Sequence, residues 1–380
     1  MLPFFPKSAG PSPSFPGMSG RKWTGRKPII YNAPQAFVGS GPYVCRDFDK
    51  TQGTYLYEAF PDYYRGKPKA DRLIYIRSSK PMVSLLTGQA GLANIEADMA
   101  QILLEKGLVV IKDERGWNRK LMINHRKPPF DDKRVRQAIA HAIDRRELIE
   151  KDHRGFGSPA SYGLLSMDHD MYNPDTPTYS FDPNRARRLL QSVGFQQGRD
   201  GFYEKDASPL KVELLSSAIS AGGESTADRD GEIIKKHLER AGIEVDLVHQ
   251  EQTTTDSRIN NWDFDLAVLG YGGISGDPKI LNKLISSRYG AGSVNSARFD
   301  GNEQLNSLLE EQMLEMDEVK RREIVYKIQE IYADELPAIS LYYPDSMAAY
   351  DPRKGIIWFY TRRGLAKGIP IPQNKISLLR

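Results

Sequence analysis

Apolar residues alternate with polar ones, or run together over a few positions, in six segments of the chain. Alternation with a period of two is typical of a strand that buries one face, and a short unbroken apolar run is typical of a strand covered on both faces. The segment Asp263–Tyr271 is a short, nearly unbroken apolar run, and it predicts a strand that is covered on both faces. The six predicted strands are Tyr55–Ala59, Leu73–Ile76, Leu210–Leu215, Ile243–Leu247, Asp263–Tyr271 and Ala338–Tyr343.

Apolar residues at spacings of three and four predict helices between these strands. Either of the two aspartates that open Asp131–Glu150 can cap a helix over that range. Asp182 caps a second helix, with Pro183 at its first position and Gly194 after its end. Both predictions depend on local capping chemistry as well as on the apolar stripe.

Three further helices follow from apolar stripes. The first of them stops at Gly242, and Pro337 ends the last. The stripes that these helices are expected to bury are Ile233, Ile234, Leu238 and Ala241; Leu305, Leu308, Leu309, Met313 and Met316; and Ile324, Val325, Ile328 and Ile331.

Strands and helices alternate between residues 130 and 343, which predicts an α/β lobe. The pattern on either side is strand-rich and different, so we place boundaries near Asn124 and Tyr343. This layout predicts one lobe inserted into another and joined to it by two crossings. Residues 1–40 contain seven prolines and five glycines, and residues 1–38 are expected to form a poorly ordered tail.

The charge of the chain is unevenly placed. The formal net charge is +4, but residues 1–40 carry five basic residues and no acidic one, which leaves 48 basic against 49 acidic residues elsewhere, a net −1. The excess positive charge therefore belongs to the tail, and no nucleic-acid motif accompanies it. We expect no nucleic-acid partner.

Targeting and redox features are sparse. Cys45 is the only cysteine, which excludes an intrachain disulfide and a cysteine zinc cluster. Residues 1–28 do not have the pattern of a signal peptide, because prolines interrupt any apolar helical region and the charges follow it.

No catalytic motif stands out in the sequence. There is no G-x-S-x-G, no H-E-x-x-H and no phosphate-binding glycine loop. Asp168-His169-Asp170 is the one compact group with metal-ligating side chains, but a single tripeptide supplies converging ligands poorly, which favours a solvated loop. We predict no enzyme activity, no cofactor and no metal.

The loop after the buried strand at 263–271 is the strongest candidate for ligand binding. Loops at the carboxyl edge of an α/β sheet commonly hold ligands. Tyr271 can stack or hydrogen-bond, glycines at 272 and 273 let backbone approach a ligand, and Ser275 offers a polar contact. The alternative is a plain glycine-rich turn in which Asp277 caps a helix beginning at Pro278. For Tyr271 both interpretations stand.

Five segments, in order, carry a family resemblance. They are Gly39-Ser-Gly-Pro-Tyr; Pro128-Pro-Phe-Asp-Asp-Lys-Arg-Val-Arg-Gln-Ala; Phe181-Asp-Pro-Asn-Arg-Ala-Arg-Arg-Leu-Leu with Ile233–Val248; Trp262-Asp-Phe-Asp-Leu with Gly276-Asp-Pro; and Leu336-Pro-Ala-Ile-Ser-Leu-Tyr-Tyr-Pro. Together they resemble solute-binding proteins of ABC transporters of the peptide/nickel family, family 5.

The resemblance implies an α/β, two-lobed periplasmic-binding-protein-like type II fold of cluster C that closes over a solute at its hinge. Residues 39–124 and 344–380 would form a partial lobe one, and residues 125–343 would form lobe two. Leu121–Asn124 and Ser340–Tyr343 would be the hinge strands. Family members have an export signal and further parts of lobe one before the first of the five segments, so the chain is expected to lack the N-terminal part of that lobe.

The function that the resemblance implies is capture of an oligopeptide or oligosaccharide and its delivery to ABC permease subunits in the membrane. The implied location is periplasmic or extracellular, in association with the membrane. The implied alternatives are a ligand-sensing domain of a regulatory protein and a non-functional truncated remnant. Peptide-binding members hold the peptide amine with an acidic residue where Ile274 or Ser275 stands here, which leaves an uncharged solute equally open. The predicted ligand-binding residues are Tyr271, Gly272, Gly273, Ser275, Asn124 and Tyr342.

Overall fold

The computed structural model describes residues 41–49, 51–217, 229–272, 274 and 276–359, and the predicted tail lies outside them. The chain divides into two compact units, residues 1–77 and residues 78–380. In the first unit, three antiparallel strands form a sheet in the order β1-β2-β3. These strands are β1 (Tyr43–Asp49), β2 (Thr54–Ala59) and β3 (Arg72–Tyr75).

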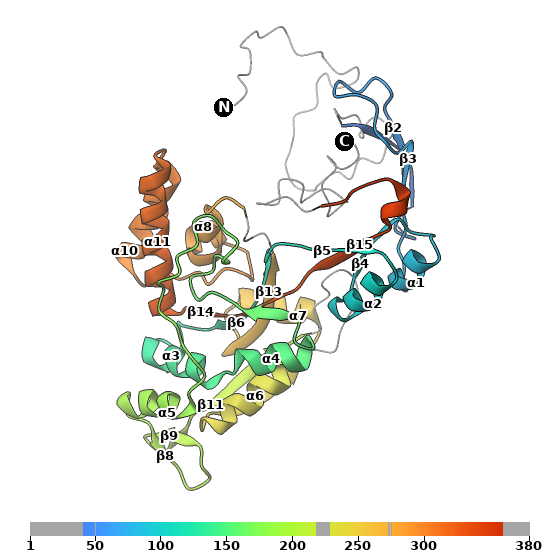
Figure 1. Ribbon diagram of the computed structural model, residues 1–380. Coiled ribbons are helices and arrows are strands. Elements are labelled where there is room, and N and C mark those ends of the chain that lie inside the picture. Colours follow the sequence, from blue (N-terminus) through green and yellow to red (C-terminus); the bar gives the residue numbers. More distant parts are fainter. Residues whose placement is uncertain (1–40, 50, 218–228, 273, 275, 360–380) are drawn as a thin grey trace, which may run out of the picture. The chain divides into compact units, whose positions relative to one another are not determined.

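A six-stranded mixed sheet is the centre of the second unit, with the strand order β12-β11-β13-β6-β14-β7 (Figure 1). β11 pairs in parallel with β12 and with β13, whereas β6 runs antiparallel to both of its neighbours. The strands are β6 (Trp117–Ile123), β7 (Gly157–Pro159), β11 (Lys211–Ser216), β12 (Glu244–His249), β13 (Leu266–Gly272) and β14 (Ala338–Pro344).

Helices cover both faces of this sheet, and successive residues of the central strands pack into different cores. Leu121 and Ile123 of β6 lie in one apolar cluster, and Met122 between them lies in the other. This two-sided burial explains why β13 reads as an unbroken apolar run. The helices are α3 (Lys133–Ala142), α4 (Arg145–Asp152), α5 (Pro183–Ser192), α6 (Asp230–Arg240), α7 (Gln252–Asn260), α8 (Ile280–Ile285), α9 (Ser287–Gly290), α10 (Glu303–Leu314) and α11 (Glu318–Glu335).

Two smaller sheets complete the described part of the second unit. One has the order β4-β15-β5 and packs a core of Leu85, Leu103, Leu108 and Ala349 with two short helices; the other has the order β10-β9-β8. Their elements are α1 (Pro81–Leu86), β4 (Leu92–Ile95), α2 (Ala100–Glu105), β5 (Val109–Lys112), β8 (Gln196–Gln197), β9 (Tyr203–Lys205), β10 (Ser208–Pro209) and β15 (Met347–Tyr350), with single 3-10 turns at Ala97–Met99 and Pro352–Lys354.

The structure confirms the six predicted strands to within a few residues, and with them the α/β class. The helix predicted over Asp131–Glu150 is wrong, because two helices lie there. Asp132 caps α3, as predicted, by accepting the N–H of Arg134. Asp144 then adopts an extended conformation and accepts the N–H groups of Arg146 and Glu147, so it starts a new helix, α4.

Two predicted details near α8 and α10 are also wrong. Met313 and Met316 are 43% and 92% exposed, because α10 ends at Leu314 and the chain turns away to the cap of α11. α8 starts at Ile280 rather than at Pro278. The carboxylate of Asp277 does accept a backbone N–H just before the helix, that of Lys279, and it forms an ion pair with Arg321 of α11.

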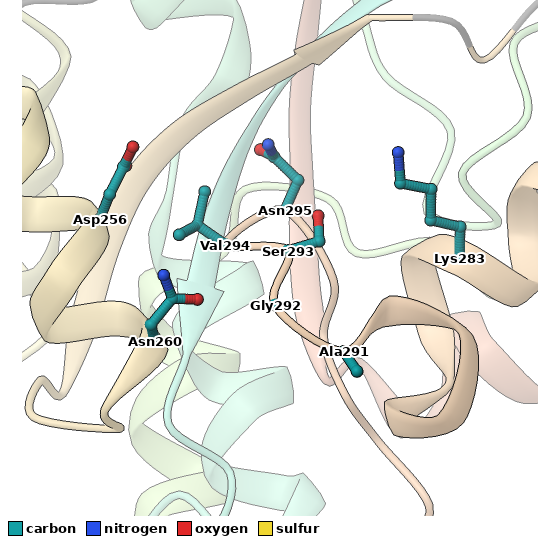
Figure 2. Close-up of a pocket in the computed structure, with 8 residues that line it drawn as sticks. All are labelled: Asp256, Asn260, Lys283, Ala291, Gly292, Ser293, Val294 and Asn295. Carbon is teal, nitrogen blue, oxygen red and sulfur yellow. The ribbon is translucent and has the colours of Figure 1, made fainter. Parts of the chain in front are cut away.

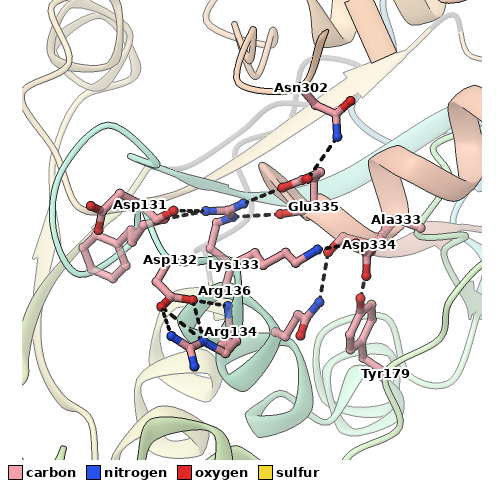
Figure 3. A network of polar contacts seen from close by, with 12 residues as sticks. Asp131, Asp132, Lys133, Arg134, Arg136, Tyr179, Asn302, Ala333, Asp334 and Glu335 are labelled. Atoms are coloured by element: carbon pink, nitrogen blue, oxygen red, sulfur yellow. Dashed lines mark hydrogen bonds and ion pairs between the residues drawn. The ribbon is translucent and has the colours of Figure 1, made fainter. Parts of the chain in front are cut away.

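A buried arginine holds α3 against the end of α11 (Figure 3). The guanidinium of Arg136 is 2% exposed and donates to the carbonyl oxygens of Phe130, Asp131 and Glu335. It also forms an ion pair with the Glu335 carboxylate. These carbonyls belong to the turn before α3 and to the last turn of α11. The segment that begins at Pro128, one of the five that carry the family resemblance, therefore stabilises the scaffold.

Replacement of Arg136 by Met is expected to lower the free energy of unfolding by about 3–5 kcal/mol, because it leaves buried carbonyls and a carboxylate without their donor. Urea unfolding measures this change. The control is Arg134→Met on the same helix, whose ion pair with Asp132 is exposed and is worth at most about 1 kcal/mol. Equal losses in both variants would contradict the assignment.

Candidate functional site

The carboxyl ends of β11, β12 and β13 lie at one edge of the six-stranded sheet. β6 begins at this edge, because it is antiparallel to β13 and pairs Trp117 with Gly272 and Asn118 with Tyr271. The end of β14 lies there too, since Tyr342 pairs with Arg119. Two of the predicted ligand-binding residues, Tyr271 and Gly272, are therefore placed beside the first residues of β6.

Gly270 permits a close approach between β13 and an aromatic ring. A Cβ atom at this position would lie 1.8 Å from a ring carbon of Trp117, which is far inside van der Waals contact. The indole of Trp117 therefore occupies the space that a side chain at 270 would need. This packing fixes the start of β6 against β13, next to Tyr271.

Two lysine ammonium groups lie close to the ring of Tyr271. Lys120 Nζ is 5.7 Å from the ring centroid and Lys283 Nζ is 5.6 Å from it, both within the range of cation–π attraction. Lys120 comes from β6 and Lys283 from α8. Lys120 also donates a hydrogen bond to the backbone carbonyl of Asn295. The side chains thus converge from three separate parts of the chain.

An open pocket of about 510 Å³ adjoins this group (Figure 2). Lys283 and Asn295 line it, and Asp256 of α7 stands on the opposite side. The other lining residues are Asn260, Ala291, Gly292, Ser293 and Val294. The pocket is mostly polar and suits a small hydrogen-bonding solute.

Burial strongly perturbs Lys120. The residue is 2% exposed, and burial lowers the pKa of its ammonium from 10.5 to about 7. Among the described residues, no carboxylate forms an ion pair with Lys120 that would offset the loss of hydration. The neighbouring residue differs: Arg119 is equally buried, but its Nε lies 2.6 Å from the Asp230 carboxylate.

Tyr342 belongs to a buried polar network on the same edge. Its hydroxyl donates to Asp230 Oδ2 at 2.7 Å, so His153 Nε2, 3.0 Å away, must donate to the tyrosine oxygen. Burial, followed by the Asp230 carboxylate, raises the pKa of Tyr342, and burial lowers the pKa of His153. The network joins β14 and β6 to the first turn of α6 and to the end of α4.

Asn124 lies at the opposite edge of the sheet from Tyr271, just beyond the pair of Ile123 with Leu266. It is 4% exposed, and its side-chain amide donates to the carbonyls of Trp262 and Phe264. Asn124 therefore holds the chain that enters β13.

The glycine-rich loop is only partly described, because Gly273 and Ser275 lie outside the described residues. Ile274 is 1% exposed and packs in the core. Gly276 is held through its carbonyl by His169 Nε2 at 2.7 Å. His169 Nδ1 accepts the N–H of Met171, so Nε2 carries the proton of a neutral imidazole.

The neighbouring aspartate of the tripeptide, Asp168, forms an ion pair with Arg115. Among the described residues, no three His, Cys, Asp or Glu side chains gather closely enough to hold a metal ion.

The structure brings together Tyr271 and Gly272 with three residues that the sequence did not indicate, namely Lys120, Lys283 and Asn295. One signal was available for Lys120, because a lysine at the start of an apolar stretch in a central strand is unusual. Nothing local marks Lys283 or Asn295, whose role depends on their place in the fold.

Lys120→Met is expected to stabilise the protein at pH 7 and less so at pH 10.5. The folded state disfavours the ammonium, so the wild-type stability falls as the pH drops from 10.5 to about 7, and below that the loss is complete. Methionine carries no charge and fits a similar volume. Urea unfolding at both pH values measures the difference. The quantity compared is the free energy of unfolding of the variant minus that of wild type. A smaller difference at pH 7 than at pH 10.5 would contradict this account.

The residues that the structure describes include no helix that combines the length and the apolar character needed to span a bilayer.

Sequence comparison finds relatives among transport proteins. The chain is 26% identical over 335 residues to the heme-binding protein A of Haemophilus influenzae, a match that covers 84% of this chain and 57% of that protein. It is 24% identical over 309 residues to the dipeptide-binding protein of Escherichia coli, covering 80% of this chain and 55% of that protein. The chain thus spans about half the length of the curated relatives that it matches.

Solved structures share the fold. NikA from Brucella suis in complex with Fe(III)-EDTA superposes with a TM-score of 0.72 at 22% identity, covering 86% of this chain and 66% of that one. The oligopeptide-binding protein AppA from Bacillus subtilis, in complex with a nonapeptide, gives a TM-score of 0.63 at 22% identity, covering 82% and 62%. These likenesses confirm the predicted periplasmic-binding-protein-like fold of type II.

The family model described as "Bacterial extracellular solute-binding proteins, family 5 Middle" matches residues 2–293. This match spans well over half of the chain, and it agrees with the resemblance carried by the five sequence segments. The chain belongs to family 5 of the bacterial extracellular solute-binding proteins.

Proposed function

We propose that this chain is the solute-binding component of an ABC importer, or the greater part of one, and that it captures a small solute outside the cytoplasm. Membership of family 5 carries this proposal. Relatives are named as proteins that bind heme, dipeptides and oligopeptides, so membership of the family does not by itself define the solute. The partner would be the permease of the importer.

The solute would bind at the sheet edge where Tyr271 and Gly272 end β13. Tyr271 offers a ring face and a hydroxyl, and the adjoining pocket offers amide and hydroxyl groups. Gly273 and Ser275 follow directly in the sequence and are proposed to contribute backbone and hydroxyl contacts. The proposed role is binding without a catalytic step, and the relatives are likewise named as binding proteins.

Binding is proposed to close two lobes about a hinge. The proposed division is residues 39–124 with 344–380 and residues 125–343, and the two crossings run through β6 and β14. These strands are hydrogen-bonded neighbours, with Ile339 opposite Leu121 and Tyr342 opposite Arg119. A solute that contacts both lobes shifts the equilibrium toward the closed form by its differential affinity.

Asn124 and Tyr342, which were predicted to touch the solute, are proposed instead to hold the two crossings in place. Both are buried, and their polar atoms bind protein groups: loop carbonyls for Asn124, and Asp230 for Tyr342. Direct contact of either residue with the solute stays a prediction.

The proposed site has no carboxylate where peptide-binding relatives are expected to clamp the amine. Ile274 is buried in the core, so it cannot present a polar group to a solute. This leaves oligosaccharides and peptides without a recognised free amine as candidates.

Replacement of Tyr271 by Ala is expected to lower the affinity for any solute that binds at this edge by about tenfold or more, because it removes the ring face and the hydroxyl together. Native mass spectrometry of the chain with mixtures of dipeptides, tripeptides and oligosaccharides identifies a solute, and titration calorimetry then measures its affinity.

Tyr289→Ala is the matched control, since Tyr289 is an exposed tyrosine of α9 that hydrogen-bonds to Glu310. If the wild-type chain binds none of these solutes, or if both variants bind as tightly as wild type, the proposed site is refuted.

A further inference from the structure

We propose that the site beside Tyr271 is an oxyanion subsite, in which Lys120 and Lys283 bind a carboxylate or phosphate group of the solute. The inference rests on the proposed function and deepens it by naming the chemical class of the solute. Two ammonium groups lie close to one aromatic ring, one of them, that of Lys283, lines a polar pocket, and neither has a carboxylate partner among the described residues.

Among the described residues, Lys120 has no carboxylate as a counter-charge. A buried charge is normally paired, because desolvation of an isolated ion costs far more than folding can supply. The same strand shows the usual solution one residue earlier, where Arg119 is paired with the buried carboxylate of Asp230. Within the part of the chain that the structure describes, Lys120 has only the carbonyl oxygen of Asn295 as an acceptor. A solute oxyanion would supply the missing charge.

Lys283 is the lysine of the pair that lines the pocket (Figure 2). Its Nζ lies 5.6 Å from the centroid of the Tyr271 ring, against 5.7 Å for Lys120 Nζ. Two like charges beside one ring disfavour each other, and an anion bound beside the same ring would offset both. Asn295 and Ser293 stand in the same wall and can donate further hydrogen bonds.

Charge is distributed unevenly around the pocket. Asp256, the one acidic residue among the described residues that line it, stands across from Lys283, and its Oδ1 accepts a hydrogen bond from Gln252 at 2.6 Å. Lys283 therefore defines a cationic end of the pocket, on the side of Tyr271. A solute with an oxyanion at one end and hydroxyl or amide groups along its length matches this arrangement.

Two pairs of solutes differ in charge while their shape stays nearly constant. N-acetyl-dialanine carries a carboxylate where N-acetyl-dialaninamide carries a neutral amide, and glucose 6-phosphate and glucose differ by the phosphate alone. Titration calorimetry of the full chain is expected to show binding of at least one anionic probe, and at least tenfold weaker binding of its partner without the oxyanion. Which anion binds distinguishes a carboxylate from a phosphate ligand.

Lys120→Met and Lys283→Met are each expected to weaken binding of that anion by ten- to a hundredfold, the range for loss of a charged hydrogen-bond partner. Lys236→Met, which removes an exposed lysine of α6, is the control and should bind as wild type does. Urea unfolding of each variant shows whether it is folded.

Three outcomes are decisive. Tighter binding of N-acetyl-dialaninamide or glucose than of the anions overturns the oxyanion subsite and leaves the proposed function standing. Anion binding that neither lysine variant weakens also overturns it, because the anion then binds elsewhere. If the wild-type chain binds none of the four probes and none of the solutes in the mixtures above, the proposed function fails and this inference fails with it.

Discussion

The pairing of β6 between β13 and β14 is the constraint on which the rest of the second unit depends. This one strand sends Leu121 and Ile123 into one core and Met122 into the other, so it joins both helix layers to the sheet. Its first residues reach the edge where β13 ends, and Asn124 beyond its last residue holds the chain that leads into β13. The register of β6 therefore sets both the packing of the cores and the geometry of the candidate site.

Polar residues of the strand follow the same alternation as the apolar ones. Arg119 points to a carboxylate that the scaffold provides, on the first turn of α6, and is a structural cation. Lys120 points to the other side of the sheet, where it contacts a carbonyl and an aromatic ring. A difference of one position separates a charge that the protein neutralises from one that has no carboxylate partner among the described residues, and this is the basis of the proposed anion specificity.

Much of the fold could be predicted from the sequence, because strands, helix starts and helix ends are encoded by residues close together in the chain. Asp182 with Pro183 and Gly194 defined α5, and the apolar run before Tyr271 defined β13. The break at Asp144 was missed because the apolar spacing continues across it, while a single capping side chain decides where the helix restarts. Met316 was misjudged for the same reason, since its spacing fits a helix that has already ended.

The candidate site was only half predictable. Tyr271 could be found because it follows a buried strand, but Lys120 meets Asn295 across 175 positions of the chain, and no local pattern encodes such a contact. One of the five segments that carry the family resemblance, the one around Arg136, holds α3 against α11. Resemblance therefore identifies the scaffold more directly than it identifies what the scaffold binds.

The close contact of Trp117 with Gly270 has a consequence for how this chain can vary. The two residues divide one fixed volume between them, so a larger side chain at 270 requires a smaller one at 117. Although they are far apart in the sequence, they form a single unit of size complementarity across β6 and β13. Related chains should therefore exchange bulk between these two positions as a pair, and a substitution at only one of them would shift the ring that borders the candidate site.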